Sequence, residues 1–251
     1  MRIDCAVSLC DRAKFSYGWD LQRDYTAADL TAILSRNRFE GAVTIAQTAD
    51  PGETDWLLGL AASHSWIVGV VTQVDDPRHW DRWQANLKFL GVELASPLLA
   101  AELESRELVC VTRLAGAAAL LDSAAVSRLV VRATAGLSFA SEEFQAWAET
   151  VAPLRSSQAL IQIDGLLEHA GPAGWQAATY QPWVRHLLAS FGSERILFGS
   201  GWPLSMPHHT WKESLACFTQ AMGARTMAER ALILGENAAK YYPRRVRVGY
   251  T

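Results

Sequence analysis

The sequence predicts an α/β fold in which short strands alternate with helices. Two observations support this prediction. Apolar runs of strand length recur along the chain, and the segments between them carry apolar residues at helical spacing. No linker, low-complexity tract or internal repeat interrupts the 251 residues. We therefore expect a single domain over residues 1–251.

The expected strands begin close to the first residue. Ile3, Cys5 and Val7 alternate along the first apolar run, which is typical of a strand with one buried face. Runs of the same kind recur and give eight expected strands. They cover Ile3–Leu9, Val43–Gln47, Ile67–Thr72, Leu87–Leu94, Glu107–Val111, Leu129–Ala133, Ala159–Ile163 and part of Glu194–Pro203.

Residues suited to helix ends and helix faces mark the segments between these strands. Thr26 and Asp29 have the spacing of a capping box, so we expect a helix to begin there. Trp80, Trp83 and Leu87 recur at helical spacing and predict a helix face packed on the strands.

The second half of the chain carries similar signals. Pro182 suits the first turn of a helix, and Gly192 is the expected residue that ends it. The basic residues 243–247 are expected to form a solvated end.

The last apolar run stops abruptly. Ile196-Leu197-Phe198 is followed by Gly199-Ser200-Gly201, and Trp202 and Pro203 then turn the chain away. A buried strand that ends in this way is expected at the mouth of a barrel.

Composition excludes several classes of function. The net charge of −3 gives no basic field for nucleic acid, and no apolar run is long enough to span a membrane. The first residues contain no secretory segment, and the four cysteines form no CxxC pair or disulfide framework. We therefore expect reduced thiols in a cytoplasmic protein. Ten tryptophans are many for this length, and we expect several to line a pocket or an interface.

Several segments together resemble one known family. They are Tyr17-Gly18-Trp19 with the residues up to Thr26, Glu53-Thr54-Asp55-Trp56, the Gly-Ser-x-Trp-Pro end of the last strand and Gly235-Glu236-Asn237-Ala238. The sequence resembles the amidohydrolase-related (amidohydrolase 2) family of metal-dependent hydrolases, in its lactonase and decarboxylase branch. The resemblance covers nearly the whole chain. Periodicity supports an alternating α/β fold, and the resemblance selects a single closed (β/α)8 TIM barrel.

The chain differs from the family at the positions where the resemblance implies metal-binding and catalytic residues. The family carries Asp-x-His-x-His on the first strand, and its two histidines bind a metal ion; here they correspond to Ala6 and Ser8. The sixth-strand histidine of the family is replaced within Arg132-Ala133. The catalytic aspartate of the last strand corresponds to Gly201. The resemblance therefore implies that the inherited metal chemistry is lost, and we expect no metal ligands.

Polar residues near the ends of other strands remain as candidates for a site. Asp164, Glu93 and His169 would form a carboxylate and imidazole cluster suited to acid and base catalysis. Their alternative role is that of polar loop residues facing water. The candidate ligand-binding residues are Arg132, Gln47, Gln162, Trp202 and His208.

Arg132 is the most informative of these residues, because an unpaired buried charge is costly. We expect it to pair with Glu93 or Asp164 and to fill the space of a metal ion and substrate. The alternative is that its fork binds an anion such as a carboxylate.

Three functions follow as hypotheses. One is a structural component of an oligomer, held by exposed tryptophans at a symmetric interface. Of the other two, the first is a pseudoenzyme without a cofactor that binds a small molecule or supports a partner subunit. The second is a divergent, metal-independent hydrolase that acts on a cyclic ester or small carboxylate. A bound divalent transition metal such as zinc, held by His169, His208 or His209, would favour the enzyme.

Overall fold

The computed structural model describes residues 1–19, 23–122 and 126–242. Eight parallel strands form one sheet in the order β1 to β8. Their bounds are β1 Ile3–Val7, β2 Gly41–Ile45, β3 Ile67–Thr72, β4 Phe89–Glu93, β5 Val109–Arg113, β6 Leu129–Arg132, β7 Leu160–Ile163 and β8 Ile196–Phe198. Each strand pairs with the next one along the chain, as the repeated alternation of strand and helix predicts.

The sheet closes where its two edge strands meet. The Gly201 amide donates to the Ala6 carbonyl at 3.0 Å, and the Ser8 amide donates to the Trp202 carbonyl at 2.8 Å. These bonds join the end of β1 to the chain just after β8. The fold is therefore the single (β/α)8 TIM barrel that the resemblance implies, and that prediction is confirmed.

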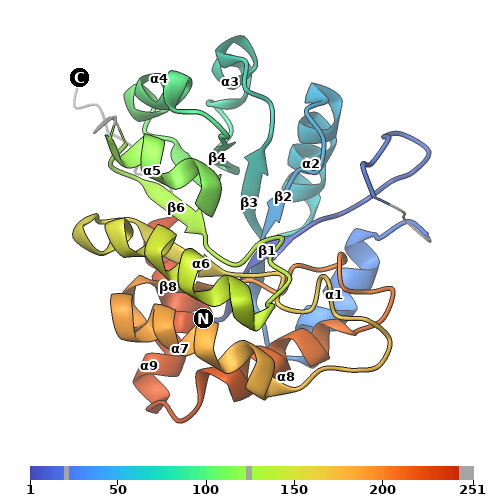
Figure 1. Cartoon of the computed structure of the whole chain (residues 1–251). Coiled ribbons are helices and arrows are strands. Elements are labelled where there is room, and N and C mark those ends of the chain that lie inside the picture. The colour runs from blue at the N-terminus through green and yellow to red at the C-terminus, as the bar shows by residue number, and fades with distance from the viewer. Residues whose placement is uncertain (20–22, 123–125, 243–251) are drawn as a thin grey trace.

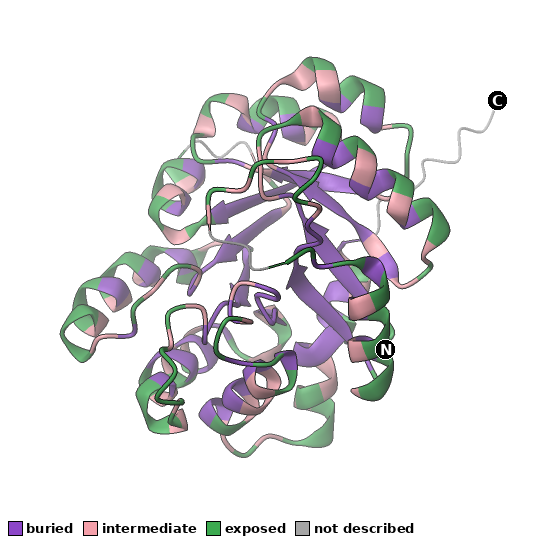
Figure 2. Ribbon diagram, turned by 90° about the vertical axis from the view of Figure 1, so that its right-hand side faces the viewer, coloured by how far each residue is buried: buried purple, intermediate pink, exposed green. Residues whose placement is uncertain are grey.

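Helices surround the strands (Figure 1). The α-helices are α1 Ala27–Arg36, α2 Pro51–Ser63, α3 Pro77–Trp83, α4 Ala100–Ser105, α5 Leu114–Asp122, α6 Phe144–Val151, α7 Ala177–Phe191, α8 Trp211–Met222, α9 Met227–Ala231 and α10 Asn237–Tyr241. Short helical turns lie at η1 Pro97–Leu99, η2 Ser141–Glu143, η3 Ala152–Ser156, η4 Ser193–Arg195 and η5 Leu232–Glu236. Figure 2 shows the buried strands at the centre, with helices whose outer sides are exposed.

Two apolar cores hold this arrangement together. The larger one lies between the strands and the surrounding helices. The smaller one fills the inside of the barrel with alternate strand residues such as Ile3, Val43, Leu90 and Leu197, and Tyr242 from the C-terminal end joins it. The filled interior makes the barrel a packed core, so access for a ligand is restricted to the strand ends and the loops.

Two helix ends agree with the sequence analysis. Thr26 and Asp29 form a reciprocal capping box at the start of α1. Gly192, with a φ of 68°, ends α7 in a conformation that favours glycine.

Other local predictions are wrong. Leu87 lies outside α3 and is 60% exposed, because that helix ends at Trp83. Pro182 lies inside α7 and not in its first turn, since the helix begins at Ala177. Glu107 has a φ of 55°, which a strand cannot adopt, so β5 begins two residues later at Val109.

The tryptophans mainly fill the core. Six of the ten are at most 5% exposed, including Trp80 and Trp83 of α3. Their area is used to pack helices against the barrel, so the high tryptophan count mostly reflects the outer core.

None of the helices in the described part of the chain combines the length and the apolar character needed to cross a membrane. The basic residues 243–247 lie outside the described residues.

Candidate functional site

The candidate site lies at the carboxyl ends of the strands, which we call the barrel mouth. Glu93 is the last residue of β4 and Arg132 the last residue of β6. Asp164 directly follows β7, and Gly201 follows β8 after a short turn. Since parallel strands end at one face of a barrel, residues far apart in sequence meet there.

Arg132 is the centre of the barrel mouth. Its Nε and Nη2 atoms donate to Oδ2 of Asp164 at 2.9 and 2.7 Å, and its Nη1 atom donates to Oε2 of Glu93 at 2.8 Å. The side chains of Arg132, Glu93 and Asp164 are 6%, 10% and 0% exposed. The predicted pairing of Arg132 is therefore observed, with both candidate partners at once.

This network compensates the cost of burying charge. Although burial opposes the charged form, the carboxylates of Asp164 and Glu93 raise the pKa of Arg132 above its ordinary value. Arg113 adds a second cation, with its Nε atom 3.3 Å from Oε1 of Glu93. Two carboxylates thus face two guanidinium groups, and Arg132 stays protonated at any pH at which the protein is folded.

Two polar atoms beside the network lack partners within the described residues. They are Oδ1 of Asp164 and Nε2 of Gln162. The Gln162 side chain points into the barrel, where its Oε1 atom accepts from the Tyr242 hydroxyl at 3.3 Å. Asp164 is held by Thr134, whose hydroxyl accepts from the Asp164 amide and donates to its carbonyl. The network is therefore rigid, with one acceptor and one donor that a bound group would satisfy.

Two glycines close the barrel mouth beside this network. Gly201 has a φ of 70°, and a Cβ atom at this position would lie 2.8 Å from the Cα atom of Gly165. A Cβ atom on Gly199 would lie 2.7 Å from the Cβ of Ala6 and 2.8 Å from the Cβ of Asp164. The backbone after β8 thus lies against β1 and β7, and a larger side chain at Gly201 requires this packing to change.

Asp4 supports the same turn from outside the barrel and was not singled out from sequence. Its Oδ1 atom accepts from the amides of Ser200 and Ala6 at 2.8 and 3.2 Å, and its Oδ2 atom accepts from Nε1 of Trp211 at 2.7 Å. Asp4 is fully buried, and burial raises its pKa to about 6 against these hydrogen bonds. In the sequence, only its place in the first-strand motif could have pointed to Asp4. Its partners Ser200 and Trp211 lie about 200 residues away along the chain.

The raised pKa of Asp4 predicts a loss of stability as pH rises. The folded pKa of about 6 lies above the ordinary value of 3.8, so the folded state binds the proton more tightly. The stability that the folded state gains from this tighter proton binding is fully present below about pH 4. It is lost as pH rises through about 6. The difference in unfolding free energy between wild type and Asp4→Asn should therefore fall by roughly 2–3 kcal/mol from pH 4 to pH 7. Urea unfolding at both pH values measures it, and an unchanged difference would contradict the assignment.

Glu168 is a further carboxylate near the barrel mouth. Its side chain is partly buried, and it makes no hydrogen bond or ion pair with the described residues. Burial and the neighbouring Asp164 carboxylate raise the pKa of Glu168, while His169, Arg132 and Arg113 oppose the rise. His169 itself is exposed. The carboxylate cluster expected from sequence thus contains Glu168, and His169 lies at its solvent side.

The remaining candidate ligand residues lie apart from the network. Gln47 is partly buried and its Nε2 atom donates to the Ile45 carbonyl at 3.2 Å. Trp202 is 1% exposed and packs edge to face on Tyr25, so a ligand reaches it only if the loops move. His208 is exposed, and its neighbour His209 is buried against the Gly171 carbonyl. These residues do not converge on one pocket.

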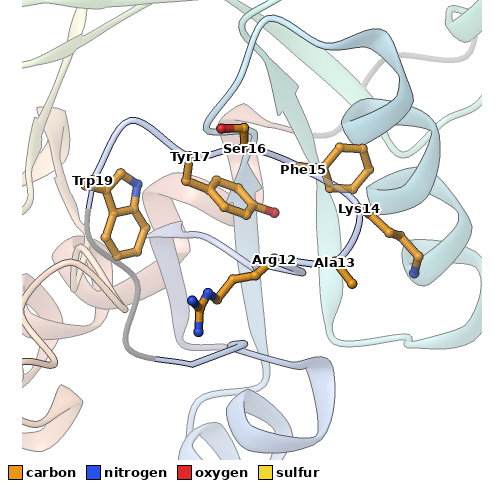
Figure 3. Close-up of a pocket in the computed structure, with 7 residues that line it drawn as sticks. All are labelled: Arg12, Ala13, Lys14, Phe15, Ser16, Tyr17 and Trp19. Carbon is orange, nitrogen blue, oxygen red and sulfur yellow. The ribbon is translucent and has the colours of Figure 1, made fainter.

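A separate pocket lies in the loop between β1 and α1 (Figure 3). Its volume is about 370 Å³. Its lining combines two cations, three aromatic rings and a hydroxyl, from Arg12, Ala13, Lys14, Phe15, Ser16, Tyr17 and Trp19. None of these residues belongs to the barrel mouth, so the two features are distinct.

Comparison with known proteins identifies a family and a relative that this chain resembles, which the fold alone cannot do. A model of the amidohydrolase family matches residues 130–244. The chain is also 25% identical over 256 aligned residues to the L-fucono-1,5-lactonase of Burkholderia ambifaria, and the alignment covers 88% of this chain and 86% of that protein. The chain is therefore similar to the amidohydrolase family, as expected from sequence. The lactonase agrees with the branch expected from sequence.

Solved structures of two other proteins share the fold of this chain. A zinc-bound amidohydrolase from Burkholderia multivorans has a TM-score of 0.82 at 21% identity, covering 96% of this chain and 99% of that one. A probable 2-pyrone-4,6-dicarboxylic acid hydrolase from Acinetobacter baumannii, with citric acid bound, has a TM-score of 0.79 at 14% identity. It covers 96% of this chain and 98% of that one.

The residues at the barrel mouth do not fit a zinc ion. Zinc sites in proteins use three or four histidine, cysteine or carboxylate ligands. The described residues contain no group of three or more such side chains placed to hold a metal ion. The resemblance places the family's first-strand histidines at Ala6 and Ser8, which carry a methyl group and a hydroxyl. The carboxylates of Glu93 and Asp164 are already paired with the guanidinium of Arg132.

Proposed function

We propose that this amidohydrolase-related barrel is a non-catalytic paralogue that binds a small molecule or supports a partner subunit. The proposal rests on one observation: the protein's own side chains fill the barrel mouth. Arg132 spans it by binding Asp164 and Glu93, and Gly201 lies against Gly165 where the family places its aspartate. The groups that would hold a metal ion and move protons are replaced by an internal ion-pair network.

The energetics of the network support this reading. Each oxygen of Glu93 and one oxygen of Asp164 already accept from a guanidinium group. A substrate carboxylate or a metal ion would have to break these charge-assisted hydrogen bonds, each of which contributes about 1.5–3 kcal/mol. The arrangement therefore stabilises the closed mouth more than an open, ligand-ready one.

Lactone hydrolysis tests the proposal directly. Protein purified without chelator or affinity-tag metal is assayed before and after addition of zinc, against L-fucono-1,5-lactone and 2-pyrone-4,6-dicarboxylate. We expect no hydrolysis above the spontaneous rate in either state. Zinc-dependent turnover of either lactone would overturn the proposal, and metal analysis of the same samples shows whether zinc was retained.

One observation favours a second function, a metal-independent hydrolase. The pKa of Glu168 is raised, whereas Asp164 beside it accepts from the Arg132 guanidinium. Two carboxylates with different environments are the arrangement that provides one acid and one base. Hydrolysis without metal that is lost in Glu168→Gln and retained in Glu142→Gln, an exposed control, would establish this function in place of the first.

A further inference from the structure

We propose that a water molecule is bound inside the barrel, where it joins the side chain of Gln162 to that of Asp164. The inference goes beyond the proposed function, because it assigns a binding site to the interior of the barrel and not to its mouth. It rests on two buried side chains that each have an open hydrogen-bonding atom, and on the contacts that hold them in place.

Gln162 and Asp164 lie on the same face of one strand. Leu160 belongs to the core inside the barrel, whereas Ile161 and Ile163 belong to the core between the strands and the helices. Side chains alternate between the two faces of a strand, so Gln162 and Asp164 follow Leu160 into the interior. Both side chains have no exposed surface. A partner for their polar atoms must therefore lie inside the protein.

Each of these two side chains is held at one polar atom and open at the other. The Tyr242 hydroxyl donates to Oε1 of Gln162 at 3.3 Å, and Nη2 of Arg132 donates to Oδ2 of Asp164 at 2.7 Å. Nε2 of Gln162 and Oδ1 of Asp164 are buried without a partner among the described residues. Buried polar atoms are costly without hydrogen bonds, so this donor and this acceptor indicate a bound group that satisfies both.

A single water molecule has the size and the hydrogen bonds that this place requires. Residues two apart on a strand have Cα atoms roughly 6.6 Å apart. Two hydrogen bonds of about 2.9 Å each let one water reach across such a separation. The water accepts from Nε2 of Gln162 and donates to Oδ1 of Asp164. A cation would face the amide hydrogens of Gln162, and an anion would face the carboxylate of Asp164, so neither fits.

The fit does not depend on the orientation of the Gln162 amide. If its oxygen and nitrogen exchange places, Nε2 donates to the Tyr242 hydroxyl and Oε1 becomes the open atom. The water then donates one hydrogen to Oε1 and the other to Oδ1 of Asp164. The guanidinium of Arg132, bound to the same carboxylate, disfavours a cation in this orientation too.

The water completes a chain of hydrogen bonds through the barrel. Tyr242 donates to Gln162, and the water joins Gln162 to Asp164. Asp164 accepts from Arg132, which also donates to Glu93 at the end of β4. The interior core at Tyr242 is thus connected to the barrel mouth. The open acceptor of Asp164 is satisfied from inside the protein, so the Arg132 network is complete without an external ligand.

A high-resolution crystal structure of the intact protein tests the site directly. We expect one ordered water within about 3.2 Å of both the open amide atom of Gln162 and Oδ1 of Asp164. Direct pairing of these two side chains, or no water between them, would overturn the proposal. This wild-type structure decides the question even where a substituted protein does not fold.

Magnetic relaxation dispersion of water counts long-lived internal waters in solution and allows a matched comparison. Gln162→Leu removes both polar atoms of the amide, so we expect the count to fall by one. Tyr242→Phe removes the hydroxyl that contacts Gln162 and leaves both partners of the water, so we expect no loss.

An unchanged count in Gln162→Leu would contradict the site, as would a water lost only in Tyr242→Phe. None of these measurements involves turnover, so the lactone assay decides the proposed function independently.

Discussion

Replacement of Arg132 by alanine should destabilise the protein by about 3–5 kcal/mol. The substitution leaves the carboxylates of Asp164 and Glu93 without their shared guanidinium, and Asp164 has no exposed surface. An uncompensated buried carboxylate is costly because water cannot solvate it. Equilibrium unfolding in urea at pH 7 measures the loss.

Arg113→Ala is the matched control for this result. Arg113 also contacts Glu93, but its side chain is 59% exposed and its Nε–Oε1 distance is 3.3 Å. Exposed pairs of this kind contribute less than about 1 kcal/mol. A loss below about 1 kcal/mol for Arg132→Ala, equal to that of Arg113→Ala, would show that the Arg132 network does not stabilise the fold.

Introducing an aspartate at Gly201, where the resemblance places the catalytic aspartate of the family, should not confer lactonase activity and should destabilise the protein. Gly201 has a φ of 70°, and any Cβ atom would lie 2.8 Å from the Cα and 3.0 Å from the amide nitrogen of Gly165. Conformational strain of about 1–3 kcal/mol adds to overpacking of about 1–3 kcal/mol. We expect Gly201→Asp to lose roughly 2–6 kcal/mol in urea unfolding and to hydrolyse neither lactone.

A pair of alanine variants separates the two costs. Gly174 also has a positive φ, 93°, but a Cβ atom there would contact nothing within 4 Å. Gly174→Ala therefore reports strain alone, and Gly201→Ala reports strain plus the contact with Gly165. Equal losses in the two variants would refute the close approach, and lactone hydrolysis by Gly201→Asp would refute the closed mouth.

These two predictions describe the barrel mouth as a structural element. In one, the charges of Arg132, Asp164 and Glu93 hold three strand ends together; in the other, backbone contact between Gly165 and Gly201 joins the loops after β7 and β8. The proposed non-catalytic function follows from both features.

Part of this description could be derived from the sequence. The alternation of apolar runs predicted the α/β fold, because the spacing of buried residues is a local property of strands and helices. Thr26 and Gly192 predicted helix ends for the same reason, since a cap acts on adjacent backbone groups. The pairing of Arg132 with acidic strand ends was also accessible, because a buried cation needs a counter-charge.

The tertiary structure decided what depends on contacts between distant residues. Asp4 became a buried acceptor only because Ser200 and Trp211 meet it across the closed barrel. Gly201 became sterically restricted only because Gly165 lies against it. Most of the tryptophans were assigned to the core by the packing of helices, which no local pattern specifies. Sequence periodicity determines which face of an element is apolar, but the fold determines which residue that face meets.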